Sequence, residues 1–529
     1  MLPHRLEQIL RVVCYGVLAA YCILLVISPA FGPNDDHRLL DTVQLGKRLP
    51  FYITPSDGRF YPLVAEEYWL LSKIFASPLV YYSYNAAQLV VFFFLFRFIL
   101  GRATSSRALV NLATLGAVLA PGFPMAWFRL HVPERDVVFF LAVFLASFLA
   151  LDRTSRPLAL LSVGLAAGNV ALYYKEPAFV LLGVFSLCYL IGPRERTARW
   201  QRRLSVLMLL GCGVFLAFYY LLVFRQMAGP RYGNPSSGAL TFLSEAIGYG
   251  AINDPAMLCL ILPLFVSRVY VLVRDKDAFR PLPDSMLFAG VAYAGVFFVL
   301  RIESPYYFLP SYVFAMPGLV HHLEKLWVET RVWRSLGYVT ALLFCTVGLA
   351  TTLRVISDAK YWPINLTGAV DTMAERLRTS RCDRSRKIVL LDVKPGDGLE
   401  MCVSFIAFLR ARGIPPARFC VASSGRVGDA VVAQETLSVV PFVTQQDCGH
   451  ATNIGDFVVV IPYMSHITNY GKLFSWLAQQ HRLIFRSESG LAFPNLLRFL
   501  KDVAQGHARF RDVFSSPAYY ADFYVFERV

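Results

Sequence analysis

The sequence predicts a polytopic α-helical membrane protein with about eleven transmembrane helices and a soluble α/β domain at its C-terminal end. Hydrophobic residues make up 56% of the 529-residue chain and charged residues only 16%, whereas a soluble domain carries about 25% charged residues. The apolar residues also cluster in long runs, such as 12–31, 204–224 and 336–353. Runs of this length can cross a hydrocarbon core of about 30 Å.

Eleven segments have the length and apolar character of membrane spans. They are expected at residues 12–30, 85–101, 108–128, 137–151, 158–173, 178–192, 204–224, 256–273, 285–300, 306–320 and 336–353. Residues 1–360 are therefore expected to form the transmembrane module, with a long first outer segment at about 31–84. Residues 361–529 are expected to form the soluble domain.

Basic residues are distributed unevenly among the segments that connect these spans. If the N-terminus lies inside, the cytoplasmic segments hold 18 Lys and Arg in 64 positions, and the opposite segments hold 11 in 101. Since basic residues accumulate on the cytoplasmic side, this orientation is favoured. It also explains the net charge of +15 without a nucleic-acid partner. An odd number of spans then places the C-terminal domain outside, on the periplasmic face of a bacterial inner membrane.

The C-terminal region has the composition of a water-soluble fold from about residue 361. Strands are expected at 387–392, 418–422, 457–463, 482–486 and 523–527, and helices at 398–412, near 468–480 and at 494–504. The order strand, helix, strand over the first three of these elements predicts a βαβ unit. We therefore expect a small α/β domain.

Four of the ten cysteines fall in this domain, and none forms a Cys-x-x-Cys pair that would indicate zinc. They are Cys382, Cys402, Cys420 and Cys448. A domain outside the cell membrane lies in an oxidising compartment, where disulfides form. Four cysteines allow three pairings, which the sequence does not distinguish, and buried free thiols are the alternative.

The first outer segment combines carboxylates with aromatic side chains. Asp35 and Asp36 follow the first span directly, and Asp57, Arg59, Tyr61, Glu66, Glu67, Tyr68 and Trp69 come later in the segment. Aromatic rings cover the C–H faces of sugars and carboxylates bind their hydroxyl groups, so this composition is typical of a sugar site. The alternative is an interfacial aromatic belt with ordinary solvated acids.

Other outer segments also place charges at the membrane surface. Lys175 and Glu176 lie in a very short connection between two apolar segments. Arg301 and Glu303 hold the corresponding position after the ninth span, and Arg129 follows the third. Charges at membrane depth are costly and usually functional. The alternative for each is a snorkelling side chain or a charge that only sets topology.

The overall layout resembles the GT-C superfamily of membrane glycosyltransferases. Shared features are an acidic pair directly after the first span, a long first outer segment, a similar number of spans and an outer C-terminal domain. In residues, the resemblance rests on Asp35-Asp36, and more loosely on 57–60 (Asp-Gly-Arg-Phe) and 174–176 (Tyr-Lys-Glu). The chain looks most like bacterial lipid-linked aminoarabinose and arabinofuranose transferases and enzymes that modify O-antigen or other glycans. Its C-terminal domain matches no particular member.

This resemblance implies a reaction and roles for residues. In the family, the acid beside the first span is the general base, which deprotonates an acceptor hydroxyl as it attacks a sugar carried on polyprenyl phosphate. Asp35 is the first candidate for this role and Asp36 the second, in a single displacement that inverts the anomeric centre. The leaving phosphate requires cations, for which Lys175, Arg301 and Arg129 are the candidates. Candidates for contacts to the sugar are Asp57, Arg59, Tyr61, Glu66, Glu176 and Glu303.

The expected partners are a polyprenyl-phosphate-sugar donor, the membrane, and an acceptor glycan, lipid or surface protein such as pilin. Nucleic acid is not expected. No metal or other cofactor is expected, because no His-x-x-x-His or similar spacing occurs. A divalent cation bound by acids and water is the alternative, and some members of the family need one.

Two rival functions are a transporter or flippase for a lipid-linked glycan and a non-catalytic membrane scaffold. A transporter often has paired inverted halves with broken helices, and the sequence has no such symmetry.

Overall fold

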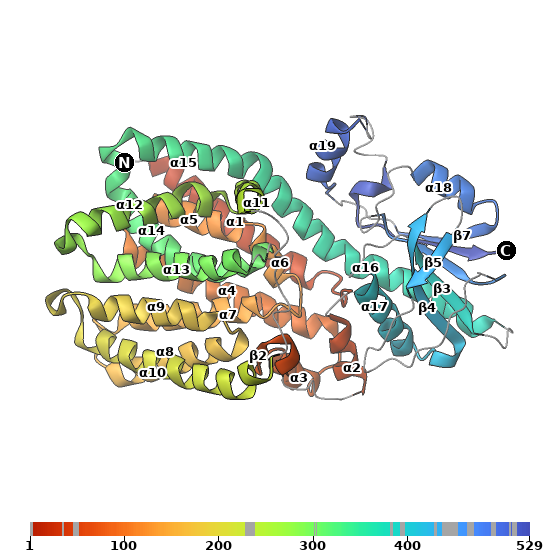
Figure 1. Cartoon of the computed structure of the whole chain (residues 1–529), viewed down its shortest axis with the longest axis horizontal. Helices are drawn as coiled ribbons and strands as arrows, with labels where there is room; N and C mark the ends of the chain where they lie inside the picture. The colour runs from red at the N-terminus through yellow and green to blue at the C-terminus, as the bar shows by residue number, and fades with distance from the viewer. Residues whose placement is uncertain are drawn as a thin grey trace.

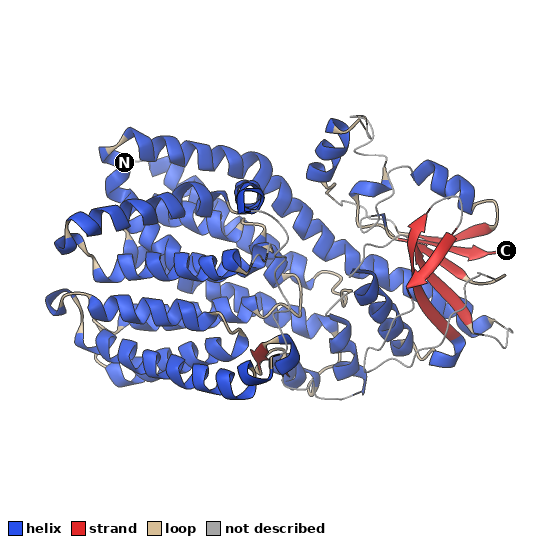
Figure 2. Cartoon of the chain, viewed as in Figure 1, coloured by secondary structure: helices blue, strands red, loops and turns tan. Residues whose placement is uncertain are grey.

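A helical bundle is followed by a mixed α/β domain, and a long helix runs from one into the other (Figures 1 and 2). The structure, a computed structural model, describes residues 4–33, 36–45, 52–227, 239–300, 302, 304–380, 385–391, 397–427, 431–435, 453–462, 470–487, 493–506, 509 and 516–529.

All eleven predicted spans are helical, which confirms the polytopic α-helical fold. Among the described residues, seven helices are long and apolar enough to cross a membrane, and two shorter helices are also apolar. The helices of the bundle are α1 (His4–Val26), α4 (Pro78–Ala103), α5 (Arg107–Val118), α6 (Gly122–Trp127), α7 (Glu134–Ala150), α8 (Pro157–Tyr174), α9 (Ala178–Ile191), α10 (Arg199–Leu222), α11 (Ala239–Asn253), α12 (Leu262–Arg274), α13 (Pro281–Val299), α14 (Leu309–Glu329), α15 (Arg331–Leu343) and α16 (Leu349–Thr379).

The structure differs from the predicted span map in three places. The third span, expected at 108–128, is broken into α5 and α6, because Pro121 has no N–H to continue the hydrogen bonds of α5. A helix, α11, occupies part of the expected outer segment 225–254. The expected domain boundary at 360–361 falls inside α16, which continues to Thr379. Amino-acid composition indicates whether a segment lies in lipid or in water, but it does not indicate where a helix ends.

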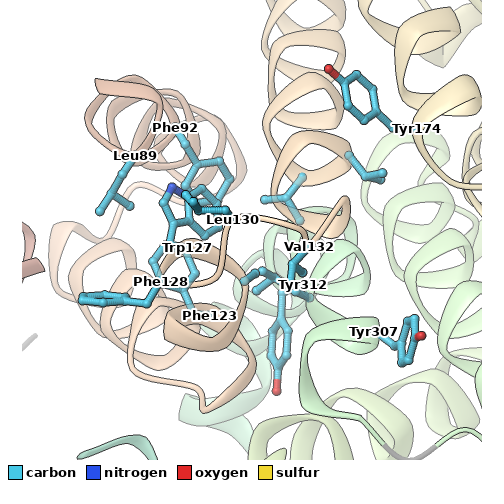
Figure 3. Packing of buried hydrophobic residues seen from close by; sticks show 14 of the residues in the cluster. Leu89, Phe92, Phe123, Trp127, Phe128, Leu130, Val132, Tyr174, Tyr307 and Tyr312 are labelled. Carbon is cyan, nitrogen blue, oxygen red and sulfur yellow. The ribbon is translucent and has the colours of Figure 1, made fainter. Parts of the chain in front are cut away.

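Buried aromatic rings fill the bundle next to the break between α5 and α6. The rings of Phe123 and Trp127 stack with centroids 4.3 Å apart, and the Phe92 ring lies 5.2 Å from Trp127. Figure 3 shows these side chains together, with Phe128 and Leu130 following them along the chain. This packing holds the connection from α6 to α7 against α4.

The first outer segment folds into α2 (His37–Leu45), the strands β1 (Tyr52–Thr54) and β2 (Arg59–Tyr61), and α3 (Glu66–Ser72). The two strands form an antiparallel hairpin in which Tyr52 pairs with Tyr61. Its turn contains Gly58 with φ +70°, a left-handed conformation that glycine adopts without strain. The Tyr219 hydroxyl donates to the Gly58 carbonyl at 3.1 Å, so the hairpin is attached to α10.

The C-terminal domain contains a six-stranded sheet in the order β5-β4-β3-β6-β8-β7, in which β4, β3 and β6 are parallel. The predicted βαβ unit is present, with α17 between β3 and β4. All five predicted strands are found, and β5, which pairs with β4 at the edge of the sheet, was not expected. The elements are β3 (Arg386–Leu391), α17 (Asp397–Ala411), β4 (Phe419–Val427), β5 (Val431–Glu435), β6 (Phe457–Val460), α18 (Tyr470–Leu477), β7 (His481–Arg486), α19 (Leu496–Ala504) and β8 (Tyr524–Arg528).

Hydrogen bonds from α16 and α17 hold this domain against the bundle. On α16, the Asn365 amide donates to the Ala521 carbonyl at 2.7 Å, and Ser357 Oγ accepts from the Phe493 N–H at 2.8 Å. On α17, Ser404 is hydrogen-bonded to His37 at the start of α2. The C-terminal domain therefore lies at the end of the bundle that carries the first outer segment (Figure 1).

The cysteines of the domain differ from one another. Cys420 is disulfide-bonded, whereas Cys402 is a buried free thiol on α17. Of the two alternatives left open by the sequence, a buried free thiol therefore holds for Cys402, which packs in the core, and a disulfide holds for Cys420. Cys382 and Cys448 lie outside the described residues.

Candidate active site

A cavity of about 300 Å³ lies where the bundle meets the C-terminal domain. Six separate parts of the chain contribute to it: the first outer segment, the α6–α7 connection, the residue after α8, the short 3₁₀ helix η7 (Pro305–Phe308), α16 and α17. The lining residues are Gly32, Pro33, Asp36, Arg38, Tyr52, Arg59, Tyr61, Val64, Phe128, Arg129, His131, Val132, Pro133, Glu134, Lys175, Tyr306, Tyr307, Asp358, Ala359, Trp362, Pro363 and Glu400.

Asp36 is the carboxylate in the cavity lining that follows the first span. It is 6% exposed. Its Oδ2 accepts a hydrogen bond from the Gly32 N–H at 3.1 Å, and its Oδ1 accepts one from the His131 N–H at 3.0 Å. These two bonds orient the Asp36 carboxylate in the cavity lining.

A lysine on α16, the last helix of the bundle, also fixes the segment that carries Asp36. Lys360 Nζ on α16 donates to the carbonyl oxygens of Leu24 and Ser28, at 3.1 and 3.3 Å. A cation at this position is favourable, because the last carbonyl groups of a helix lack partners and carry partial negative charge. The end of α1, just before Asp36, is thus held against α16.

Lys175 is a buried cation on another wall of the cavity. Its Nζ lies 2.9 Å from Glu134 Oε1 in an ion pair, with exposures of 6% and 0% for the two side chains. The ammonium also faces the rings of Tyr307 and Tyr61, at 4.9 and 5.5 Å. Burial by itself would lower the pKa of Lys175, but Glu134 and Tyr307 offset this effect and the pKa lies above its ordinary value. Lys175 is therefore charged.

The β1–β2 hairpin presents further cations on aromatic faces. Tyr52 and Tyr61 stack with centroids 4.6 Å apart. The Arg38 guanidinium lies over Tyr52 at 5.2 Å, and the Arg59 guanidinium lies over Tyr61 at 5.7 Å. Aromatic faces attract cations and restrict their orientation. The cross-strand pair therefore positions two guanidinium groups in the cavity wall.

A second buried charge cluster lies outside the cavity lining. Arg135 is hydrogen-bonded to Glu67 at 3.1 Å and to Asp136 at 2.6 Å, and it also contacts the Tyr68 hydroxyl. The Tyr174 hydroxyl donates to Glu67 at 3.0 Å. Burial, with a contribution from the Asp136 charge, raises the pKa of Glu67 to about 8. This cluster ties α3 to α7 and α8, and so supports the walls of the cavity.

Five of the residues predicted for the site do line the cavity. They are Asp36, Arg59, Tyr61, Arg129 and Lys175. They come from three segments that the orientation analysis placed on one side of the membrane, and their approach was not visible in local sequence.

The other predicted site residues are located differently. Glu176 is not among the lining residues. Its Oε1 accepts from the Phe60 N–H at 2.6 Å and its Oε2 lies 4.0 Å from Arg59, so it supports the hairpin. Glu66 is the first residue of α3 and also lies outside the lining. Asp35, Arg301, Glu303 and the side chain of Asp57 lie outside what the structure describes.

Several lining residues were not predicted as site residues. The clearest local signal is at Glu134, an acid that follows Pro133 just before the span expected at 137–151. No local pattern marks the residues from α16 and α17, because they lie more than 200 positions after Glu134. The lining residues not predicted that have charged or large aromatic side chains include Arg38, Glu134, Tyr306, Tyr307, Asp358, Trp362 and Glu400.

A second cavity, of about 370 Å³, has an almost entirely apolar lining contributed by α11, α12, α13 and η7. Asp254 is the one acid among its described lining residues, and it accepts a hydrogen bond from the Tyr312 hydroxyl at 2.9 Å. Burial raises the pKa of Asp254 to about 7. The helix η7 separates the two cavities, since Tyr306 and Tyr307 line the first and Phe308 lines the second.

In the described part of the chain, no three His, Cys, Asp or Glu side chains gather in a way that could hold a metal ion.

No protein-family model and no curated protein matches the chain. Among solved structures, it is similar to ArnT from Cupriavidus metallidurans. The apo form has 13% identity and a TM-score of 0.44 over 89% of this chain and 95% of that one. The form bound to undecaprenyl phosphate has 12% identity and a TM-score of 0.43 over 90% of this chain and 96% of that one.

The chain is also similar to the oligosaccharyltransferase of Archaeoglobus fulgidus, with 12% identity and a TM-score of 0.41 over 75% of this chain. It spans 63% of the length of that protein. Likenesses at this level concern the fold alone. Because the identities are low and the TM-scores are below 0.5, an activity is inferred for this chain only from the residues of its cavity.

Proposed function

We propose that this protein is a membrane glycosyltransferase of the GT-C type, which moves a sugar from a polyprenyl-phosphate donor to a hydroxyl group of an acceptor. One observation carries the proposal. A single cavity at the end of the bundle combines an oriented buried carboxylate, Asp36, with the cations Lys175, Arg59 and Arg129 and with aromatic rings. A carboxylate serves as general base, cations stabilise a leaving phosphate, and aromatic faces pack against sugar rings.

The reaction that fits these groups is a single displacement. The acceptor hydroxyl gives its proton to Asp36 while its oxygen forms a bond to the anomeric carbon. The bond from that carbon to the phosphate oxygen breaks, and both of its electrons leave with the lipid phosphate. Lys175, Arg59 and Arg129 would stabilise this anion. The anomeric centre is inverted, because the acceptor attacks from the face opposite the leaving group.

The second cavity supports a donor that is a lipid. A polyprenyl phosphate has an anionic head and a long apolar tail, and the protein has a polar cavity and an apolar cavity on the two sides of η7. If the polyprenyl tail of the donor lies in the second cavity, the donor phosphate would lie near Tyr306 and Tyr307, on the side where Lys175 lies. The apolar lining contributes affinity through burial of the tail.

The proposed location is the outer face of a bacterial inner membrane, with the cavity and the C-terminal domain in the periplasm. The asymmetry of Lys and Arg supports this orientation. The proposed acceptor is a glycan, a lipid or a surface protein. The proposed reaction needs no cofactor, and addition of EDTA or of Mg²⁺ and Mn²⁺ to the purified enzyme tests this directly.

The experiment compares cell-surface glycans and glycoproteins by mass spectrometry in cells with and without the protein. The wild-type gene should restore a glycan that is lost on deletion. Asp36→Asn keeps the size of the side chain and removes the base, so product formation should fall by about 10²–10⁴-fold. Its purified protein should bind undecaprenyl phosphate as the wild type does, since the phosphate contacts are untouched.

Asp35→Asn is the matched comparison, because the adjacent acid was the first candidate from the sequence. If only Asp35→Asn loses product, the general base is Asp35 and not Asp36, and the proposed reaction is otherwise unchanged. Full restoration of the glycan by both variants would contradict general-base catalysis and would favour a transporter or a scaffold.

A further inference from the structure

The C-terminal domain and the helix that leads into it supply one wall of the catalytic cavity. Asp358 and Trp362 come from α16, and Glu400 comes from α17. Asp358 and Trp362 are one helical turn apart and therefore lie on the same face of α16. We use "C-terminal wall" for these three residues.

The C-terminal wall has a different chemistry from the rest of the cavity. The Lys and Arg side chains in the described lining are Arg38, Arg59, Arg129 and Lys175, which all precede α9. The described part of the C-terminal wall adds two carboxylates and an indole ring. Carboxylates repel an anionic phosphate, so the donor phosphate belongs on the side of Lys175. The C-terminal wall is suited to a neutral group that donates hydrogen bonds.

The C-terminal wall is also held in place by contacts behind it. Asp358 Oδ2 accepts from Arg354 Nε at 3.2 Å, and Arg354 in turn contacts Asn495 Oδ1 at 3.4 Å. On α17, Ser404 Oγ lies 3.2 Å from His37 Nδ1. Ser404 is one turn after Glu400, so this bond fixes the turn of α17 that carries Glu400 next to the segment of Asp36. A site held by such supporting contacts is preorganised for a ligand.

We propose that the C-terminal wall is the acceptor subsite and that the acceptor is a saccharide. The apolar face of the sugar ring packs on Trp362, and hydroxyl groups donate to Glu400 and Asp358. This arrangement presents one further hydroxyl group to Asp36. The inference rests on the proposed function for the role of Asp36, but binding of a saccharide to this wall can be tested separately.

The first experiment uses the photoreactive residue p-benzoylphenylalanine in place of Glu400, which is only partly buried and lines the cavity. The full chain, carrying Asp36→Asn to prevent turnover, is irradiated in cells and the adducts are identified by mass spectrometry. The control has the same residue in place of Trp476, which is 39% exposed on α18 and outside the cavity lining. A saccharide adduct without polyprenyl phosphate should form at position 400 and not at position 476, because the donor also carries a sugar.

Three results would overturn the inference: no adduct at position 400, adducts that contain only polypeptide or phospholipid, or the same adducts at both positions. The phospholipid result would indicate a lipid acceptor, and the polypeptide result a protein acceptor.

The second experiment uses Glu400→Gln, which keeps the shape of the side chain and removes its charge. Glycan product per cell should fall about tenfold or more, while the affinity of the purified protein for undecaprenyl phosphate stays within about twofold of wild type. Equal losses of product and of undecaprenyl phosphate affinity would place Glu400 in the donor site, and unchanged product would remove it from the subsite. A carbohydrate adduct together with full activity of Asp36→Asn and Asp35→Asn would refute the proposed function alone.

Discussion

At the scale of single residues, the charges in this protein are stabilised in pairs. Lys175 and Glu134 are both buried, and each is the nearest opposite charge of the other. Removing one member of such a pair typically costs about 3–5 kcal/mol, because the other charge stays buried without compensation. A loss of function after a single substitution therefore has two explanations, a lost phosphate contact or a destabilised fold.

A pair of variants separates these two effects. Lys175→Met should lower the free energy of unfolding by about 3–5 kcal/mol and should lower the affinity for undecaprenyl phosphate by about tenfold or more, since charge-assisted hydrogen bonds contribute about 1.5–3 kcal/mol. Adding Glu134→Gln should recover most of the stability and none of the affinity. Thermal unfolding in detergent and titration with the lipid measure both quantities. Recovery of affinity in the double variant would mean that Lys175 only stabilises the fold.

Glu67 should make stability depend on pH. Its pKa in the folded protein is raised from 4.5 to about 8, chiefly by burial. The unfolded chain loses this proton near pH 4.5 and the folded chain near pH 8, so the folded state binds more protons between these values. Stability should therefore fall as the pH rises through this window. Glu67→Gln resembles the protonated acid, so its unfolding temperature should match wild type near pH 5 and exceed it near pH 8.

Glu66→Gln is the control for this measurement, because it changes the adjacent acid on α3 and leaves the Arg135 cluster intact. Its unfolding temperature should follow that of the wild type at each pH. A Glu67→Gln profile parallel to wild type would contradict a neutral Glu67 in the folded protein.

At the scale of elements, glycines let α13 and α14 approach each other closely. A Cβ at Gly290 would lie 2.7 Å from Ala315 Cβ and 2.8 Å from the Ser311 carbonyl oxygen. A Cβ at Gly318, on the other helix, would lie 2.7 Å from the Pro283 carbonyl oxygen. Small residues at such contacts are typical of helix packing in membranes. Since α14 follows η7 directly, this packing also sets the position of Tyr306 and Tyr307.

The same helix offers a matched test of this packing. Gly290→Ala should lower stability by about 1–3 kcal/mol, because backbone and Cβ atoms of α14 would have to move. Gly295→Ala, also on α13, has no atom within 4 Å of the added Cβ. It should leave stability unchanged or slightly raised, because Ala is the better helix former. Thermal unfolding measures both, and equal effects of the two variants would contradict the close approach at Gly290.

At the scale of the whole molecule, polar groups gather at both ends of the bundle. One end carries the cavity and the C-terminal domain. At the other, Asp284 binds Arg268 through both carboxylate oxygens, at 2.9 and 2.8 Å, and lies 3.0 Å from His322. Every oxygen of Asp284 thus has a partner, as expected for a structural cluster that joins α12, α13 and α14. The described cavity of about 300 Å³ lies at the other end, next to the C-terminal domain.

The orientation of these two ends is testable with reporter fusions. A reporter after Val529 should give a periplasmic signal, and a reporter near Arg199 should give a cytoplasmic one, because basic residues are concentrated in the segments on the Arg199 side. A cytoplasmic signal from the C-terminal fusion would place the cavity inside the cell and would remove the outer-face donor from the proposal.

The helical membrane fold and the βαβ unit could be predicted from the sequence alone, and so could five of the residues that line the cavity. Apolar runs of membrane length and the strand–helix–strand order are local properties, so they are readable without contacts. Asp36, Arg129 and Lys175 were predicted because charges next to membrane spans are conspicuous, and Arg59 and Tyr61 because the first outer segment combines charged and aromatic residues.

Which groups share the cavity depends on the three-dimensional packing of distant segments. Trp362 and Glu400 meet the segment of Asp36 from more than 300 positions away, because α16 continues past the membrane and docks α17 on α2. The ion pair of Glu134 with Lys175 also depends on the packing of α7 against α8 and not on local pattern. Long-range contacts depend on how whole elements pack, and a sequence read segment by segment carries no information on that packing.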